Sequence, residues 1–95
     1  MGYSREIVFD KTSGETLDYT VEWKNWLGDD TIASDAWAVD TGITIDETAG
    51  GVSSLRTVWL SGGTAGTTYK VTNTVTTTDG RVAARSFYIN LVTAR

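Results

Sequence analysis

The sequence predicts an all-β fold, an antiparallel sandwich of about seven strands, and three observations support this prediction. Apolar and polar residues alternate with a period of two in several short segments, as in strands with one buried face. Turn signals rich in Gly, Asp and Ser separate these segments at intervals of roughly ten residues. No segment shows the apolar repeat of about 3.6 residues that an amphipathic helix requires.

The first expected strand, residues 4–11, has an apolar centre formed by Ile7, Val8 and Phe9. This centre does not alternate strictly, which is typical of a strand that is covered on both faces. The first strand of a sandwich usually lies at an edge, however, so a neighbouring subunit would have to supply the cover by edge-strand addition. We therefore predict an interface at Ile7, Val8 and Phe9. The alternative is that Val8 is simply an exposed β-forming residue.

The next expected strand has the clearest alternation in the chain, because every second residue from Leu17 to Trp23 is apolar. A polar corner and two more strands follow it, and the glycines Gly50 and Gly51 then mark the longest loop. These elements are expected at residues 16–24 (strand), 25–31 (corner), 32–40 (strand), 43–45 (strand) and 46–54 (loop).

The last three strands are expected at residues 55–60, at residues 69–75, and from beyond Gly80 to Leu91. A three-residue loop, Thr78-Asp79-Gly80 with a left-handed Gly80, places the apolar residues of both final strands on one face. The resulting pairs are Val75 with Ala83, Val71 with Phe87, and Tyr69 with Ile89. The same register puts Asn73 and Arg85 on this face, so we expect them near the rim of the sheet.

The order of strands and aromatic residues fits a sandwich of immunoglobulin type. Trp37 lies on the third strand, where a core tryptophan is common, and Tyr69 follows a Gly-rich crossover, where a tyrosine hydroxyl often bonds back to the corner backbone. An up-and-down barrel or another Greek-key order is also compatible with the pattern. The residues expected in the core are Trp23, Trp37, Tyr69 and Phe87.

Length and composition narrow the class of protein. A chain of 95 residues buries only roughly 60 to 65% of its unfolded surface, so we expect residues 1–95 to form a single immunoglobulin-like β-sandwich domain. The sequence has no Cys, which excludes disulfides and favours assembly in a reducing cytoplasm. It has no His either, which excludes the common zinc sites and Ser-His-Asp triads. We therefore expect neither an enzyme nor a cofactor.

Charge and hydropathy exclude two classes of partner. The formal net charge of −4 opposes the phosphate backbone of nucleic acid. No apolar run approaches the roughly 20 residues of a membrane span, and the first residues do not form a secretion signal. We expect no contact with nucleic acid or membrane.

Two tryptophans and two acidic pairs are candidates for a site. Trp26 lies in the polar corner, and Trp59 lies between two inward-facing residues, so both are candidate anchors for a protein interface. For both rings the alternative is folding back over the end of the sandwich. The pairs Asp29-Asp30 and Asp46-Glu47 lack the spacing of a calcium loop, so we interpret them as solvated loops and expect no metal.

Several blocks of the sequence together resemble the small immunoglobulin-like virion proteins of tailed bacteriophages, often described as fiber-tail adaptors. The blocks cover nearly the whole chain after Ser13: LDYTVEW (17–23), WLGDDTI (26–32), WAV (37–39), GITI (42–45) and VWLSGGTAGTTY (58–69). The resemblance implies a structural subunit of the phage particle, assembled in the cytoplasm of the host bacterium. It also implies contacts with other virion proteins, namely tail, fiber or capsid subunits, in several copies per particle.

Two alternatives to a tail-associated adaptor stay open at this point. One is a capsid decoration or cement protein. The other is a carbohydrate-binding module, in which Trp26 or Trp59 stacks on a sugar ring and Asp29 or Asp30 orients its hydroxyl groups.

Overall fold

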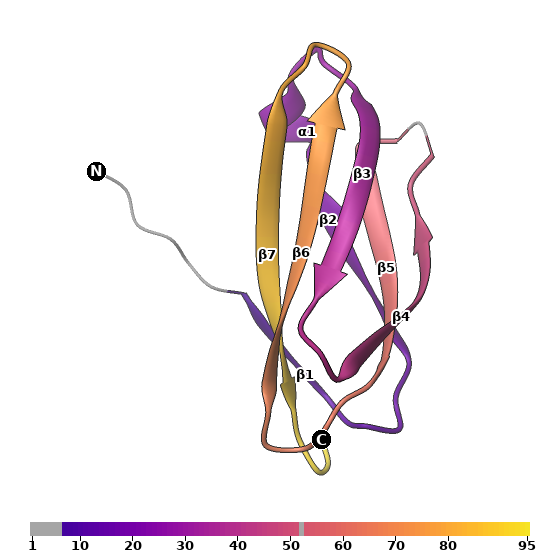
Figure 1. The fold of residues 1–95 in the computed structure, drawn as a ribbon, viewed down its shortest axis with the longest axis vertical. Coiled ribbons are helices and arrows are strands. Elements are labelled where there is room, and N and C mark those ends of the chain that lie inside the picture. The colour runs from indigo at the N-terminus through magenta and orange to yellow at the C-terminus, as the bar shows by residue number, and fades with distance from the viewer. Residues whose placement is uncertain (1–6, 52) are drawn as a thin grey trace, which may run out of the picture.

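The computed structural model describes residues 7–51 and 53–95, and it contains two layers of β-strands (Figure 1). This arrangement confirms the predicted all-β sandwich of about seven strands. Of the expected first strand, residues 4–6 lie outside the described residues. The elements are β1 (Val8–Lys11), β2 (Leu17–Glu22), the helical turn α1 (Lys24–Leu27), β3 (Ile32–Val39), β4 (Ile43–Ala49), β5 (Leu55–Gly62), β6 (Thr68–Thr77) and β7 (Val82–Leu91).

The two sheets have the strand orders β1-β7-β6-β3 and β2-β5-β4. β1 pairs with β7 in parallel, and the other neighbours are antiparallel. The chain therefore changes sheet between β1 and β2, between β2 and β3, between β3 and β4, and between β5 and β6, as in sandwiches of immunoglobulin type. β1 is an edge strand of the first sheet and β2 is an edge strand of the second. The two lie on the same side of the sandwich, where residues of β1, β2 and β7 line one groove.

The hairpin of β6 and β7 has the predicted register. Val75 lies opposite Ala83, Val71 opposite Phe87, and Tyr69 opposite Ile89. The turn closes with the N–H of Thr77 donating to the carbonyl of Arg81 at 2.8 Å, and Gly80 has a φ of 94°. The positive φ explains the glycine, because a side chain at that position would be strained.

The main hydrophobic core lies between the two sheets, in the half of the sandwich where β1 pairs with β7. Its buried residues are Tyr19, Ile43, Val58, Leu60, Tyr69, Val71, Phe87, Ile89 and Leu91. Trp37 was expected in the core, but its ring is only half-buried against this cluster. The reason is topological, because β3 is an edge strand and leaves one side of the ring uncovered.

Tyr69 forms the predicted corner. Its hydroxyl accepts a hydrogen bond from the N–H of Thr64 at 2.9 Å, and this bond lowers the pKa of the tyrosine. The ring packs so closely on Gly42 that a Cβ there would lie 2.8 Å from Cε1 of Tyr69. The loop between β3 and β4 is therefore fixed against the crossover between β5 and β6.

Asn73 was expected near the rim of the sheet, and this expectation is wrong, because the side chain is fully buried between the sheets. Its Oδ1 accepts a hydrogen bond from Nε1 of Trp23 at 2.9 Å, while its Nδ2 donates to the carbonyl of Ala36 at 3.1 Å and to Oδ2 of Asp35 at 3.2 Å. All of the polar atoms of this side chain therefore have partners, which makes its burial tolerable.

The polar corner at residues 25–31 also differs from expectation, because it begins inside a helical turn, α1. Trp23 and Leu27 are four residues apart, so one helical turn directs both side chains inward. They are buried with Val75 in a second, smaller cluster. Gly28 ends the turn with a φ of 62°.

β4 is longer than expected and runs to Ala49, into the segment that we interpreted as loop. Its pairing with β5 shifts register between Ile45 and Glu47. Asp46 is the extra residue of a β-bulge, and the pairing resumes at Glu47 opposite Trp59. The local sequence pattern does not reveal this bulge.

Replacement of Asn73 by Ala is expected to lower the free energy of unfolding by about 3 kcal/mol, because the indole N–H of Trp23 and the carbonyl of Ala36 would lose a buried partner. Urea unfolding of the isolated protein measures this loss. Asn25→Ala, on the exposed face of α1, is the matched control and should change stability by less than about 0.5 kcal/mol. Equal effects at the two positions would show that the Asn73 network contributes nothing.

A second prediction concerns acid stability. Arg95 donates to the carboxylate of Glu15 at 2.8 and 2.9 Å, and the N–H of Thr12 also donates to it. These bonds lower the pKa of Glu15 from 4.5 to about 2. A lowered folded-state pKa stabilises the fold above the ordinary value, and this contribution is lost as pH falls from about 4.5 to about 2.

Unfolding midpoints measured from pH 6 to pH 2 should therefore fall less steeply for Glu15→Gln than for the wild type. Glu47→Gln is the control, because the described residues offer its carboxylate no hydrogen bond. Identical slopes for Glu15→Gln and wild type would contradict the role of the Arg95 contact.

Candidate protein interface

Large apolar side chains are exposed in two places on the described chain. The first is the β7 side of the sandwich, with Ile7, Val8 and Phe9 where β1 meets β7 and Val82 at the other end of β7, and the second is the outer face of the three-stranded sheet. The exposed fractions are 52% for Ile7, 53% for Val8, 41% for Phe9, 65% for Val82, 37% for Trp59 and 42% for Leu55. Exposed apolar groups in one area indicate a surface that another molecule covers.

β1 pairs with only the last part of β7. The N–H of Tyr88 donates to the carbonyl of Ile7 at 2.8 Å, and the N–H of Val92 donates to the carbonyl of Lys11 at 2.9 Å. Even-numbered residues of β7 therefore direct their N–H groups towards β1. The pairing begins at Val8 opposite Tyr88.

The rest of this edge of β7 has no partner among the residues that the structure describes. Val82, Ala84 and Ser86 have the same parity as Tyr88, so their N–H and C=O groups point outward. The odd-numbered residues bond to β6, as Arg81 does to Thr77. Within residues 7–51 and 53–95, no strand pairs with residues 82–86 on this side. Unpaired backbone groups of this kind are a template for an added strand.

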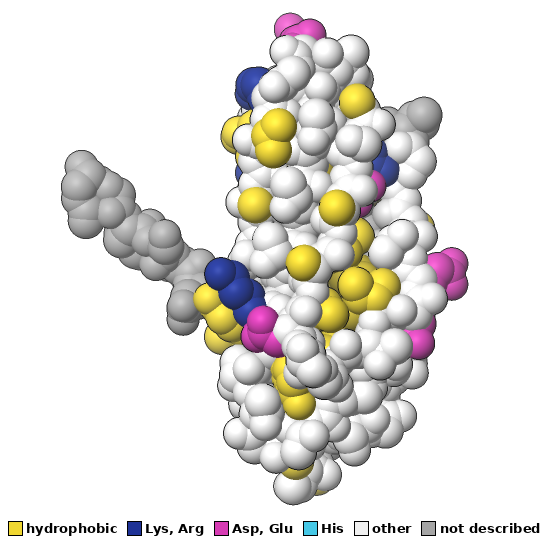
Figure 2. Space-filling model, in the orientation of Figure 1, with side chains coloured by type: hydrophobic (Ala, Val, Ile, Leu, Met, Phe, Trp, Pro, Cys, Tyr) yellow, Lys and Arg dark blue, Asp and Glu magenta, His cyan; other side chains and the backbone are white. Residues whose placement is uncertain are grey.

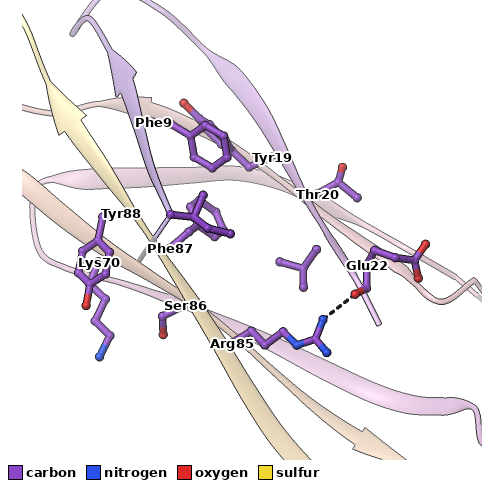
Figure 3. A pocket seen from close by; sticks show the side chains of 11 residues that line it. Phe9, Tyr19, Thr20, Glu22, Lys70, Arg85, Ser86, Phe87 and Tyr88 are labelled. Carbon is purple, nitrogen blue, oxygen red and sulfur yellow. Dashed lines mark hydrogen bonds between the residues drawn. The ribbon is translucent and has the colours of Figure 1, made fainter. Parts of the chain in front are cut away.

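A groove of about 630 Å³ lies beside this edge, between β7 and β2. Phe9 contributes one wall, with its ring centroid 5.1 Å from that of Tyr19 and 5.7 Å from that of Phe87. Figure 3 shows these three rings gathered at one end of the groove, with Arg85 and Glu22 at the other. The groove therefore has an apolar end and a polar end.

Arg85 closes the polar end. Its Nη1 donates to the carbonyl of Glu22 at 2.6 Å, and its guanidinium stacks 4.3 Å above the ring of Trp23. The carboxylate of Glu22 points away and accepts from the N–H of Lys24 and the hydroxyl of Ser54, and these bonds lower its pKa. Arg85 thus bridges the two sheets at the place where they would otherwise separate.

Tyr19 and Lys11 carry buried polar atoms near this side. The hydroxyl of Tyr19 has no hydrogen-bond partner in the described structure, and burial raises its pKa. Lys11 is fully buried, and its Nζ donates to the carbonyls of Thr12 and Gly62 at 2.8 and 2.7 Å. Burial lowers the pKa of this lysine. Lys11 ties β1 to β5 through its hydrogen bond to Gly62. The Tyr19 hydroxyl and the Lys11 ammonium are both buried, so neither polar group faces the groove.

The structure separates the predicted interface residues into three places: the start of β1, the outer face of the three-stranded sheet, and the end of the sandwich at α1. Ile7, Val8 and Phe9 come together at the start of β1, which is an edge strand as expected, and all three side chains are partly exposed in the part of the chain that the structure describes. Trp59 lies on the outer face of the other sheet, between the fully buried Val58 and Leu60. The interface role of all these residues stays a prediction.

Trp26 lies in the third place, at the end of the sandwich, and its ring is half-buried. It packs on Trp23 with the ring centroids 5.4 Å apart, and Arg81 stacks on it at 4.2 Å. The alternative that this ring folds back over the end of the sandwich therefore describes it better.

The sequence did not single out Val82, Ala84 and Ser86. Their importance depends on where the described part of β1 begins beside β7, and a strand pattern does not reveal that. Figure 2 shows the face formed by β7, β6 and β3, with a small group of yellow apolar side chains at the beginning of β1, next to a dark blue and a magenta side chain.

Other kinds of site find little support in the described residues. No group of three or more acidic side chains in this part of the chain is arranged to hold a metal ion. No helix among these residues is long and apolar enough to cross a membrane.

Comparisons with known proteins agree with the fold. The model of the family described as "Podophage GP4 fiber-tail adaptor protein gp77" matches residues 11–90. The solution structure of the PKD domain from KIAA 1837 protein is similar, with a TM-score of 0.53 and 18% sequence identity, over 97% of this chain and 86% of that chain. At this identity the likeness concerns the fold alone. No curated protein matches the chain.

Trp59→Ala is expected to cost less than about 1 kcal/mol of stability, because the ring is exposed on the outside of a sheet. Trp26→Ala should cost about 2 kcal/mol, because it removes contacts with Trp23 and the stacked Arg81. Urea midpoints of the two variants provide the comparison. A larger loss at Trp59 than at Trp26 would mean that Trp59 is a packing residue and not a contact residue.

Proposed function

The chain belongs to the podophage GP4 fiber-tail adaptor family gp77, and from this premise we propose that it joins fiber and tail proteins of a phage particle through protein contacts. Its family makes it a structural phage protein of the virion. We propose that residues 1–95 act as one rigid domain without catalytic activity, present in several copies per particle and assembled in the cytoplasm of the host bacterium.

One observation carries this proposal: the exposed apolar residues at the start of β1 lie beside the part of β7 that has no partner among the described residues. The exposed side chains of Val8 and Val82 flank this edge, and Ala84 and Ser86 lie between them on β7. A strand from a neighbouring protein would pair with residues 82–86 and extend the sheet beside the polar end of the groove, next to the start of β1. Edge-strand addition is a common way in which β-proteins bind extended segments.

The rest of the fold suits a rigid connector. β6 and β7 are the longest strands, with ten residues each, and they pair along nine consecutive positions. The Tyr69 corner lies at the start of β6 and the Asn73 network at its middle, and together they hold the two sheets in place. A partner bound at the edge of β7 therefore has a fixed orientation relative to the outer face of the other sheet.

The two alternatives have less support. The family match concerns fiber-tail adaptors, so we place capsid decoration second. For carbohydrate binding, Trp26 is no longer a candidate, because Arg81 covers its ring and Asp30 accepts a hydrogen bond from the same arginine. Only Trp59 would be available for stacking on a sugar.

The test is a proline at the open edge. Ala84→Pro removes an outward N–H without removing a bond to β6, so the isolated protein should keep its far-ultraviolet circular dichroism spectrum and most of its stability. Its copy number in purified particles should fall at least about tenfold, which corresponds to about 1.4 kcal/mol of binding free energy. The measurement is quantitative mass spectrometry of particles from a complemented deletion phage.

Ala84→Val is the matched control and should be incorporated like the wild type. Val8→Asp provides a second test that leaves β7 unchanged, and it should also reduce incorporation. Wild-type incorporation of both Ala84→Pro and Val8→Asp would exclude this edge as the interface. Absence of the wild-type protein from particles would exclude the proposed function.

A further inference from the structure

The outer face of the three-stranded sheet carries a tryptophan between two carboxylates. Trp59 on β5 lies directly opposite Asp18 on β2 and directly opposite Glu47 on β4. Cross-strand partners in antiparallel pairs point to the same face, so the three side chains form one row across the sheet. All three are exposed. We call this set the Trp59 row.

The face around this row is acidic and has no positive charge. Val58, Leu60 and Tyr19 are buried, so the alternate residues of β5 and β2 face outward. Among the described residues of the three strands, those that share this face are Asp18, Thr20, Glu22, Thr44, Glu47, Ala49, Leu55, Thr57, Trp59 and Ser61. The set contains three acids and no Lys or Arg. Neither Asp18 nor Glu47 makes a hydrogen bond or ion pair with any residue that the structure describes.

The same molecule shows what such an arrangement binds. At the end of the sandwich, the guanidinium of Arg81 stacks 4.2 Å above the ring of Trp26, and its Nε donates to Oδ2 of Asp30 at 3.1 Å. The ring attracts the cation through its electron-rich face, and the carboxylate fixes its orientation. The Trp59 row has the same ring and carboxylate but no described arginine.

We propose that the Trp59 row binds an arginine side chain of a partner protein in the phage tail. The guanidinium stacks on the indole of Trp59 and donates to the carboxylates of Asp18 and Glu47 on either side. This inference rests on the proposed function for the kind of partner, a virion protein. It adds the chemistry by which that partner is recognised.

Arginine fits this row better than other cations. A guanidinium is flat, stacks on aromatic rings and has donors at several positions around its edge, whereas a lysine ammonium is a compact point charge. β2 and β4 are separated by β5, so their backbones are about 10 Å apart. Two carboxylates on strands at this separation do not share a bare metal ion, but both can reach a planar group placed over the ring between them.

The row also lies apart from the edge of β7. It belongs to the outer face of one sheet, whereas residues 82–86 lie at the edge of the other. A protein that joins two others needs two surfaces, and these two differ in chemistry. The open edge offers backbone hydrogen bonds and apolar cover, while the Trp59 row offers an aromatic ring and negative charge.

The test is a titration of the full-length, ¹⁵N-labelled protein with the peptide acetyl-Gly-Arg-Gly-amide at low salt. The indole N–H resonance of Trp59 should shift saturably, and the indole resonances of Trp23 and Trp26 should not. The citrulline peptide has the same shape without the charge, and its affinity should be lower by about two- to fivefold. Asp18→Asn with Glu47→Gln should weaken binding of the arginine peptide by about two- to tenfold.

The matched control is Asp29→Asn with Asp79→Asn, which removes the same charge from exposed loops and should leave the affinity unchanged. Equal affinities for the arginine and citrulline peptides, or equal losses in the two double variants, would overturn the site. A protein that binds the arginine peptide but is absent from particles would overturn the proposed function alone. A protein found in particles whose Trp59 resonance ignores the peptide would overturn the site alone.

Discussion

The hydrogen bond between Trp23 and Asn73 holds the described structure together at the end away from the main core. Trp23 follows β2 in one sheet, and Asn73 lies on β6 in the other, with a donor–acceptor distance of 2.9 Å between them. The bond fixes the ring of Trp23, on which Arg85 stacks. Because Arg85 also bonds to the backbone of β2, this polar contact determines how far the sheets separate beside the groove.

The groove and the open edge follow from a mismatch in strand length. β7 has ten residues and β1 has four, so β1 leaves more than half of one side of β7 without a described partner. A protein usually protects such an edge with charge or a bulge. Here the nearest charge, Arg85, turns inward across Trp23, and apolar residues flank the unpaired segment. Among residues 7–51 and 53–95, nothing protects this edge, as is expected of a binding surface.

The sequence predicts what depends on neighbours in the chain and misses what depends on distant partners. The register of β6 and β7 was predictable, because only one loop length keeps Val71 and Phe87 on one face. The buried Asn73 was not, since its partner Trp23 is 50 residues away. The turn α1 is too short to show helical periodicity. The exposure of Val8 was predicted, but the part of β7 without a described partner depends on where β1 begins.

The two proposed surfaces divide affinity and specificity between them. Backbone pairing at an edge accepts many sequences, because every residue except proline offers the same N–H and C=O groups. Such an edge alone would also invite self-association. The Trp59 row selects by charge, since a partner without a correctly placed arginine would leave two carboxylates beside an uncovered ring. A connector with one permissive and one selective surface binds firmly while still distinguishing its partners.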